Sequence, residues 1–164
     1  MQDSHTLIVV RHGKAGELPG GPDFERALRP RGQRDSEAAG HWLVSRGYRP
    51  DAVICSAARR ARQTWQYLAR ALADEPQVSV DDQLYQADAE DVLAIISQTS
   101  PATRTLLYVG HNPAAAGVVA LLTGTQAHFP TAATAVIGVS SDWAGVAPGG
   151  GELLAVWTPA AADV

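Results

Sequence analysis

The sequence TLIVVRHG, residues 6–13, is a short apolar run that ends in two basic side chains and a glycine. Residues 7–10 predict a buried β-strand, because a continuous apolar run is typical of a strand that is covered on both faces. A tight turn after this strand needs only Gly13, so Arg11 and His12 require another explanation. They mark a candidate functional site if other segments of the chain bring complementary groups to the same place.

Length and composition predict a single globular domain that spans residues 1–164. Hydrophobic residues make up 46% and charged residues 18% of the 164-residue chain, which is enough to bury a sizeable core. The formal net charge of −4 creates no general basic field, so neither nucleic acid nor an acidic membrane is an expected partner. The apolar start is too short for a secretion signal, and no run approaches the roughly 18 residues of a spanning helix, so we expect a cytoplasmic protein. The single cysteine, Cys55, lies in an apolar run and is expected to be a buried thiol.

Strand-like and helix-like segments alternate along the chain. Strands are predicted at residues 6–10, 51–56, 77–82 and 104–110, and residues 131–159 predict two further strands that are antiparallel neighbours. Helices are predicted between these strands. The alternation indicates an α/β fold, namely a three-layer α/β/α sandwich with a mostly parallel central sheet of about six strands, at least one of them antiparallel.

Apolar residues at helical spacing define the helices. The first helix has Ala38, Ala39, Trp42 and Leu43 on one face and ends near Gly47, and the second has Ala61, Trp65, Leu68 and Leu72 on one face. Asp88 and Asp91 suit the first turn of a third helix. In the fourth, Asn112 is the expected N-cap, Pro113 the first helical residue, and Gly124 lies just past the end.

Polar groups of an unusual kind follow three of the predicted strands, where ligands of parallel α/β sheets bind. Arg11, His12 and Gly13 follow the first strand, Arg59, Arg60 and Arg62 lie near the start of the helix after the second, and His111 and Asn112 follow the fourth. Cations at a helix N-terminus oppose the helix dipole, so their presence there favours a bound anion. Each motif alone has an ordinary explanation as a turn, a solvated face or a cap. Their occurrence together at equivalent strand ends favours an anion-binding site.

This set of residues suits phosphoryl transfer. Arg11 and Arg60 would hold the oxygens of a phosphoryl group, His111 would donate a further hydrogen bond, and His12 would attack phosphorus. The ordinary histidine pKa of about 6.5 leaves much of His12 neutral at pH 7. Because the arginines stabilise the developing charge, no metal or other cofactor is required. His5, His41 and His128 show no spacing typical of metal ligands, so no metal site is expected.

The same motifs resemble those of the histidine phosphatase superfamily, which has the phosphoglycerate-mutase-like fold. VVRHGKA (residues 9–15), CSAARRARQT (55–64) and VGHNP (109–113) match its conserved blocks in order and spacing, and RALRPRGQRD (26–35) is similar to the small SixA-type branch, named for phosphohistidine phosphatases. The resemblance implies that His12 is the nucleophile and that Arg11, Arg60 and His111 are phosphate ligands. It further implies that Arg26 is an accessory ligand and that Arg59 and Arg62 are surface residues. Gly13, which lets the backbone turn closely beside the phosphate, and Asn112 are further candidate substrate-binding residues.

One position departs from the pattern of the larger relatives. Gln86 occupies the place where they carry a proton-donating glutamate, and glutamine cannot protonate an alkoxide leaving group. This departure favours substrates with P–N bonds or good leaving groups. An acid could still come from Glu17, Asp23 or Glu25 in the long loop, or from the substrate itself, whereas helix capping explains Asp88, Glu90 and Asp91.

The expected function is therefore that of a metal-independent phosphatase with a covalent phosphohistidine intermediate on His12. The expected substrate is protein phosphohistidine, and inorganic phosphate is the product. The alternatives are a phosphatase or mutase for small phosphate esters on the same fold and, from another class, a non-catalytic phosphate-binding module in signalling.

Overall fold

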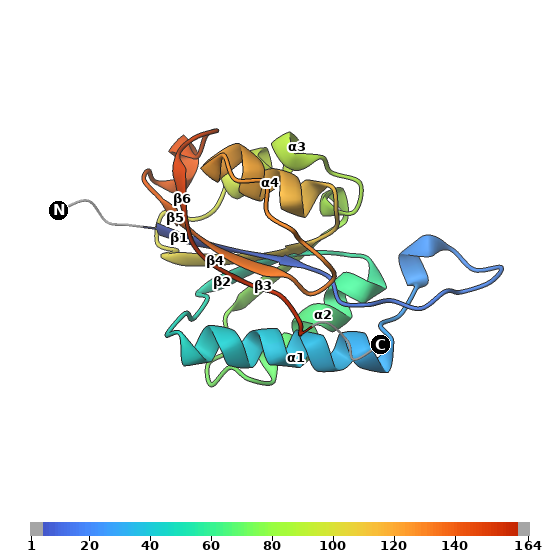
Figure 1. Cartoon of the computed structure of the whole chain (residues 1–164). Helices are drawn as coiled ribbons and strands as arrows, with labels where there is room; N and C mark the ends of the chain where they lie inside the picture. Colours follow the sequence, from blue (N-terminus) through green and yellow to red (C-terminus); the bar gives the residue numbers. More distant parts are fainter. Residues whose placement is uncertain (1–4, 161–164) are drawn as a thin grey trace.

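Strand β1, His5–Arg11, lies in the interior of a six-stranded sheet whose order is β3-β2-β4-β1-β5-β6 (Figure 1). The computed structural model describes residues 5–160. The other strands are β2 (Ala52–Ser56), β3 (Gln77–Asp81), β4 (Thr105–Gly110), β5 (Thr134–Val139) and β6 (Gly151–Trp157). Three neighbouring pairs, β1 with β4, β4 with β2 and β2 with β3, are parallel, and β5 is antiparallel to both β1 and β6. The predicted mostly parallel sheet with an antiparallel C-terminal pair is confirmed.

Two helices cover each face of the sheet (Figure 1). Helices α1 (Pro30–Ser45) and α2 (Arg59–Ala69) pack on one face, and α3 (Ala89–Ile96) and α4 (Ala114–Thr123) pack on the other. The side chains of β1 alternate accordingly: Ile8 and Val10 belong to the core beneath α1 and α2, and Leu7 and Val9 to the core beneath α3 and α4. The result is the predicted three-layer α/β/α sandwich. Within residues 5–160, no helix is both long enough and apolar enough to cross a bilayer.

The predicted inner face of α1 is partly wrong. Ala38 is exposed and Trp42 only half-buried, while the buried residues of α1 are Gly32, Ser36, Ala39, Gly40 and Leu43. The reason is a close approach between α1 and α2: a Cβ at Gly40 would lie 2.3 Å from the Leu68 carbonyl oxygen. Gly40 therefore permits the close contact between the two helices, while Trp42 packs against the edge of the core as a partly buried residue.

Two other helix boundaries differ from the expectation. Helix α2 ends at Ala69, so Leu72 lies beyond it and is half-buried. Helix α4 begins at Ala114, one residue later than predicted, although the Asn112 side chain still accepts a hydrogen bond from the Ala116 N–H at 3.2 Å. The start of α3 is as predicted, because Asp88 and Asp91 each accept the other's backbone N–H in a capping box.

The carboxyl ends of the central strands meet at one edge of the sheet. Arg11 at the end of β1 pairs with Gly110 at the end of β4, and Cys55 in β2 pairs with Val109. From this edge the chain leaves β1 in a loop that protrudes from the body of the protein and carries the short 3-10 helix η1, Asp23–Glu25 (Figure 1). The segments that carry the predicted site residues therefore begin side by side.

Candidate active site

The ring of His12 is oriented by the backbone next to it. The backbone N–H of His12 donates to the Gly110 carbonyl at 3.0 Å, and Nδ1 of the His12 ring lies 2.8 Å from the Gly13 carbonyl oxygen. Because a carbonyl oxygen only accepts, the hydrogen-bond network assigns the ring proton to Nδ1 and leaves a lone pair on Nε2. Burial, helped by the nearby positive charges, lowers the pKa of His12 to about 3, so the ring is neutral at pH 7.

His111 stands next to His12 and is held from the other side. The two ring centroids are 5.2 Å apart, and His111 Nε2 lies 2.8 Å from the Ser56 hydroxyl oxygen at the end of β2. That oxygen also accepts the Ala58 N–H at 3.3 Å, and its own proton can be donated to His111 Nε2. We assign the tautomer in which it is so donated and the ring proton of His111 lies on Nδ1. Burial lowers the pKa of His111 to about 4, and Arg60 acts in the same direction.

Arg11 and Arg60 both have buried donors without a partner. Arg60 is only 7% exposed, and its two terminal nitrogens donate to Asp23, Nη1 to the backbone oxygen at 2.9 Å and Nη2 to Oδ2 at 3.0 Å. Arg11 donates from Nη1 to the Phe129 carbonyl at 3.2 Å. Within the described part of the chain, Arg11 Nε, Arg60 Nε and His111 Nδ1 are buried and have no hydrogen-bond partner. Unpaired buried donors are unfavourable, so these three atoms suit an anionic ligand.

Position 13 is a glycine for a structural reason that the sequence did not reveal. Its N–H donates to the Thr64 hydroxyl at 2.9 Å, and that hydroxyl donates to the Arg60 carbonyl at 2.7 Å. A Cβ at Gly13 would lie 2.7 Å from the Gly32 carbonyl oxygen, which is part of α1. The glycine is therefore needed for the close contact between the end of β1 and α1. Its predicted role beside the substrate stays a prediction, since its N–H is already bonded inside the protein.

Asn112 and Arg26 both support neighbouring groups of the site. Asn112 Nδ2 donates at 2.9 Å to the Phe129 carbonyl, the same oxygen that Arg11 binds. Arg26 Nε donates to the Gly16 carbonyl at 2.9 Å, and its Nη1 is 2.9 Å from Asp23 Oδ1. Contact with substrate stays a prediction for both side chains.

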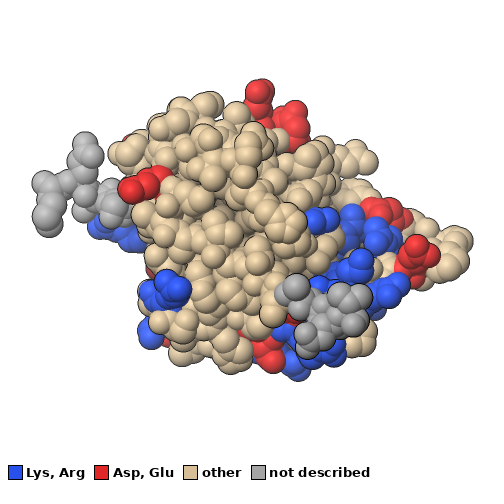
Figure 2. Space-filling model, viewed as in Figure 1, with Lys and Arg blue, Asp and Glu red and all other residues tan. Residues whose placement is uncertain are grey.

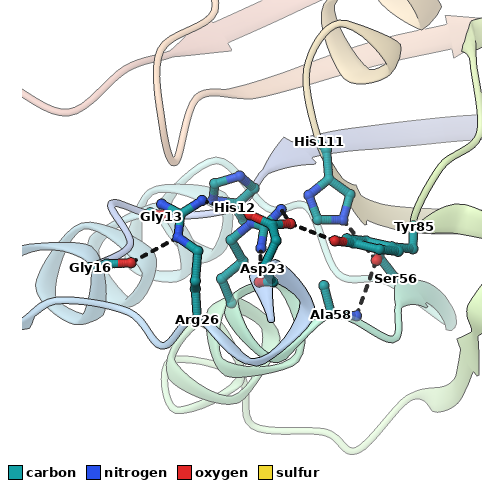
Figure 3. Close-up of polar contacts among 10 residues, drawn as sticks. His12, Gly13, Gly16, Asp23, Arg26, Ser56, Ala58, Tyr85 and His111 are labelled. Atoms are coloured by element: carbon teal, nitrogen blue, oxygen red, sulfur yellow. Dashed lines mark hydrogen bonds and ion pairs between the residues drawn. The ribbon is translucent and has the colours of Figure 1, made fainter. Parts of the chain in front are cut away.

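Asp23 and Tyr85 belong to the site, although the sequence named Asp23 only as one of three loop carboxylates and did not point to Tyr85. The Tyr85 hydroxyl donates to Asp23 Oδ2 (Figure 3). This bond, together with those from Arg26 and Arg60, holds the pKa of Asp23 well below its usual range, and it raises the pKa of Tyr85. The Tyr85 ring contacts the His111 ring edge-on, with centroids 5.7 Å apart. The position of Tyr85, next to Gln86 and after the end of β3, was the available signal.

Gln86 lies apart from this cluster. It is exposed and lines a surface groove together with Gln83, Asp91 and Gln98. Arg59 is exposed, as predicted, whereas Arg62 is half-buried and donates from Nε to the Ala57 carbonyl at 2.9 Å. Cys55 is buried as predicted, and burial raises the pKa of its thiol to about 12, which makes it unreactive at pH 7. Among residues 5–160, no three His, Cys, Asp or Glu side chains are grouped so that they could hold a metal ion.

Positive charge gathers around this end of the molecule. Nine of the 13 Lys and Arg residues of the chain fall within residues 11–34 and 59–62, although the net charge is −4. Figure 2 shows Lys and Arg side chains concentrated where the loop after β1 protrudes. Lys14, Arg29 and Arg31 are exposed there. Such a local field attracts anions to the site in an otherwise acidic protein.

Known proteins share both the sequence pattern and the fold. Residues 7–94 match the model of the histidine phosphatase superfamily (branch 1). An uncharacterized protein of Mycobacterium tuberculosis (strain ATCC 25618 / H37Rv) is 38% identical over 161 residues, which is 92% of this chain and 99% of the relative. A structure from Nakamurella multipartitia that carries the name "putative phosphohistidine phosphatase SixA" has a TM-score of 0.88 at 30% identity, covering 96% of this chain and 98% of the other. The protein histidine phosphatase SixA in complex with tungstate has a TM-score of 0.81 at 25% identity, covering 94% and 97%. The phosphoglycerate-mutase-like fold expected from the sequence is thereby confirmed.

Proposed function

Because this chain belongs to the histidine phosphatase superfamily, and is therefore a phosphatase, we propose that it removes the phosphoryl group from protein phosphohistidine through a covalent intermediate on His12. One observation carries the proposal. The hydrogen bond from His12 Nδ1 to Gly13 leaves the Nε2 lone pair unprotonated beside His111, in a site where Arg11, Arg60 and His111 each keep a buried donor free.

In the first step, His12 Nε2 attacks phosphorus and the bond to the leaving group breaks, with the electron pair of that bond going to the leaving atom. Arg11 and Arg60 stabilise the negative charge on the phosphoryl oxygens, and His111 donates from Nδ1. The low pKa of His12 keeps the nucleophile unprotonated without a separate base. Arg11 and Arg60 supply the positive charge that stabilises the phosphoryl oxygens, so the proposed step is not routed through a metal.

In the second step, a water molecule attacks the phosphorus of phosphorylated His12. The P–N bond breaks, its electron pair returns to Nε2, and inorganic phosphate leaves as H2PO4−, with the oxygen and both protons of the water. The same arginines hold the phosphoryl oxygens in both steps, so one arrangement of charges serves the whole cycle. The Gly13 carbonyl keeps the ring in place while the bond to Nε2 forms and breaks.

Two observations support phosphohistidine as the substrate. Gln86 cannot act as the proton donor that an alkyl ester requires, and it is exposed away from the cluster. The structural relatives at 25% to 30% identity carry the names "putative phosphohistidine phosphatase SixA" and "protein histidine phosphatase SixA".

Replacement of His12 tests the covalent step. The variant His12→Ala is expected to lose phosphatase activity by roughly 10³-fold or more, since a nucleophile is removed from a group of residues that act together. Wild-type protein trapped during turnover should carry an acid-labile, base-stable phosphoryl group that is missing from the variant. The matched control is His41→Ala, which removes an exposed histidine on α1. Unchanged activity in His12→Ala would rule out the covalent mechanism.

A comparison of substrates tests the proposed class. The wild-type protein should turn over a phosphohistidine peptide with a higher kcat/KM than phosphosugars. A clear preference for an alkyl monoester would favour a small-molecule phosphatase or mutase. Binding of phosphate without turnover of any of these compounds would instead indicate a phosphate-binding module.

A further inference from the structure

Asp23 brings a carboxylate to the edge of the proposed phosphoryl site. It lies in η1, on the loop that leaves β1, and contacts Arg60 through both its backbone and its side chain. The Asp23 side chain is 50% exposed, whereas that of Arg60 is 8% exposed. One guanidinium therefore joins the buried part of the site to a carboxylate that is open to solvent.

Arg60 has the geometry to hold a phosphoryl group and Asp23 at the same time. Its terminal nitrogens Nη1 and Nη2 donate to Asp23, while its buried Nε has no partner. A guanidinium offers five N–H donors in a planar fork, so the edge that contains Nε stays available to a phosphoryl oxygen. Asp23 need not leave Arg60 when the phosphoryl group binds, and its half-exposed carboxylate then remains beside the site.

The Asp23 carboxylate is an acceptor rather than an acid. Arg26 donates to Oδ1, and Arg60 and Tyr85 donate to Oδ2. An ionised carboxylate has about four acceptor positions, so three are used and one is left on the exposed side. These donors favour the charged form, and the pKa of Asp23 is lowered accordingly. The group cannot protonate an alkoxide, but it can accept one more N–H bond.

Aromatic rings stand next to this carboxylate. Phe24 and Tyr85 meet edge to face, with centroids 5.0 Å apart, and both are half-buried. Tyr85 in turn contacts His111. The Arg60 guanidinium carbon lies 5.9 Å from the centroid of the Tyr85 ring, so this pair of rings already accommodates positive charge on one side. A half-exposed pair of rings beside a carboxylate suits a flat ligand that carries positive charge, because the faces of the rings attract cations.

We propose that Asp23, Phe24 and Tyr85 form a leaving-group subsite that recognises the protonated imidazole ring of a phosphohistidine substrate. The inference rests on the proposed function and deepens it. The phosphorylated nitrogen of the ring faces His12, and the N–H of its other nitrogen donates to Asp23. When the P–N bond breaks, its electron pair neutralises the ring, which leaves as imidazole and keeps the proton it arrived with. No general acid is needed, and Asp23 is a specificity-determining residue for P–N over P–O bonds.

The test compares two substrates in three proteins. The kcat/KM values for a 3-phosphohistidine peptide and for p-nitrophenyl phosphate are measured with the wild type, Asp23→Asn and the control Glu25→Gln, which alters an exposed acid in the same turn. The ratio of the two values should fall by roughly tenfold or more in Asp23→Asn, as expected when a charge-assisted hydrogen bond is lost. Glu25→Gln should keep the wild-type ratio. Tyr85→Phe, which removes one donor to Asp23, should give an intermediate ratio.

An equal loss on both substrates in Asp23→Asn would overturn the inference, because Asp23 would then act only by positioning Arg60. Inhibition by orthovanadate provides the corresponding check, and a large loss of vanadate affinity in this variant would also count against a leaving-group role. A wild-type protein that hydrolyses esters but not phosphohistidine would overturn the proposed substrate itself, before any variant is compared. A wild type that prefers phosphohistidine, with an unchanged ratio in Asp23→Asn, would overturn only the subsite.

Discussion

The chemistry of the two histidines is set by single neighbouring atoms. The Gly13 carbonyl fixes the proton of His12 on Nδ1, and the Ser56 hydroxyl directs Nε2 of His111. One ring is therefore left with a lone pair and the other with a free N–H, although both are buried imidazoles with lowered pKa values. The same type of side chain thus provides both a nucleophile and a hydrogen-bond donor, in two rings whose centroids are 5.2 Å apart.

Replacement of Gly13 by alanine is expected to destabilise the protein by about 1–3 kcal/mol, which is typical of an overpacked site. The new Cβ would lie 2.7 Å from the Gly32 carbonyl oxygen and 2.9 Å from the Ser36 hydroxyl oxygen. Activity should fall as well, because the Gly13 carbonyl orients His12. Urea unfolding measures the stability. Gly16→Ala is the matched control, since its nearest neighbour would be 3.6 Å away, and equal stability of the two variants would contradict the packing argument.

At the scale of residues, the sequence predicted the site residues that follow the ends of strands. It missed residues such as Tyr85 and Thr64, whose site contacts join distant parts of the chain. Arg11, His12 and His111 are adjacent to strand ends, so the rule for parallel sheets places them together. Tyr85 reaches Asp23 across 62 positions of the chain. Thr64 reaches Gly13 across 51. Neither contact has a local signature, because each depends on where α2, η1 and the segment after β3 lie in space.

Helix α2 carries two functions on one face. Arg60 and Thr64 are four residues apart, about one helical turn, so their side chains lie on the same side of the helix. Arg60 extends toward Asp23, while Thr64 binds the Gly13 N–H and the Arg60 carbonyl. The helix therefore positions a phosphate ligand and at the same time anchors the turn that follows the nucleophile.

Removal of the Thr64 hydroxyl tests its hydrogen bond to the Gly13 N–H while leaving the Arg60 side chain in place. Thr64→Val keeps the shape of the side chain but leaves the buried Gly13 N–H without a partner, so a loss of about 1–3 kcal/mol in the free energy of unfolding is expected. The kcat should also fall, since Gly13 borders His12. Thr64→Ser keeps the hydroxyl and is the control. Thermal unfolding and kcat on an aryl phosphate measure both effects, and wild-type behaviour of Thr64→Val would show that the bond is dispensable.

At the scale of elements, strands were predicted more reliably than helix faces. The buried strands are continuous apolar runs that few other structures accommodate. The inner face of α1 depends instead on how closely α2 approaches it, and Gly40 permits an approach that the spacing of apolar residues does not reveal. Trp42, predicted to pack in the core, does pack against it, but it is only half-buried and stacks on Trp157 with ring centroids 6.5 Å apart.

The site lies at the carboxyl ends of the central strands, and the burial of its histidines affects the stability of the whole molecule. The site residues follow β1 and β4, which are interior strands, and helical layers cover both faces. Imidazoles there are kept neutral by burial and by neighbouring guanidinium groups. The sequence predicted this architecture from the alternation of strands and helices. It could not predict the path of the loop after β1, which sets the position of Asp23.

Stability should therefore decrease as the pH falls from about 6.5 toward 5. An unfolded histidine takes up a proton near its ordinary pKa of about 6.5. Folded His12 and His111, with pKa values of about 3 and 4, do not. The unfolded chain then binds more protons, so each of the two histidines lowers the free energy of unfolding by up to about 1.4 kcal/mol per pH unit below 6.5. Asp23 adds nothing in this interval, because a lowered carboxyl pKa changes stability only below the ordinary carboxyl pKa of about 3.9.

Urea unfolding at pH 7, 6 and 5 measures how steeply the free energy of unfolding falls with pH. His111→Gln should reduce it by the share of one histidine, and an identical slope in this variant and the wild type would show that His111 is protonated in the folded protein.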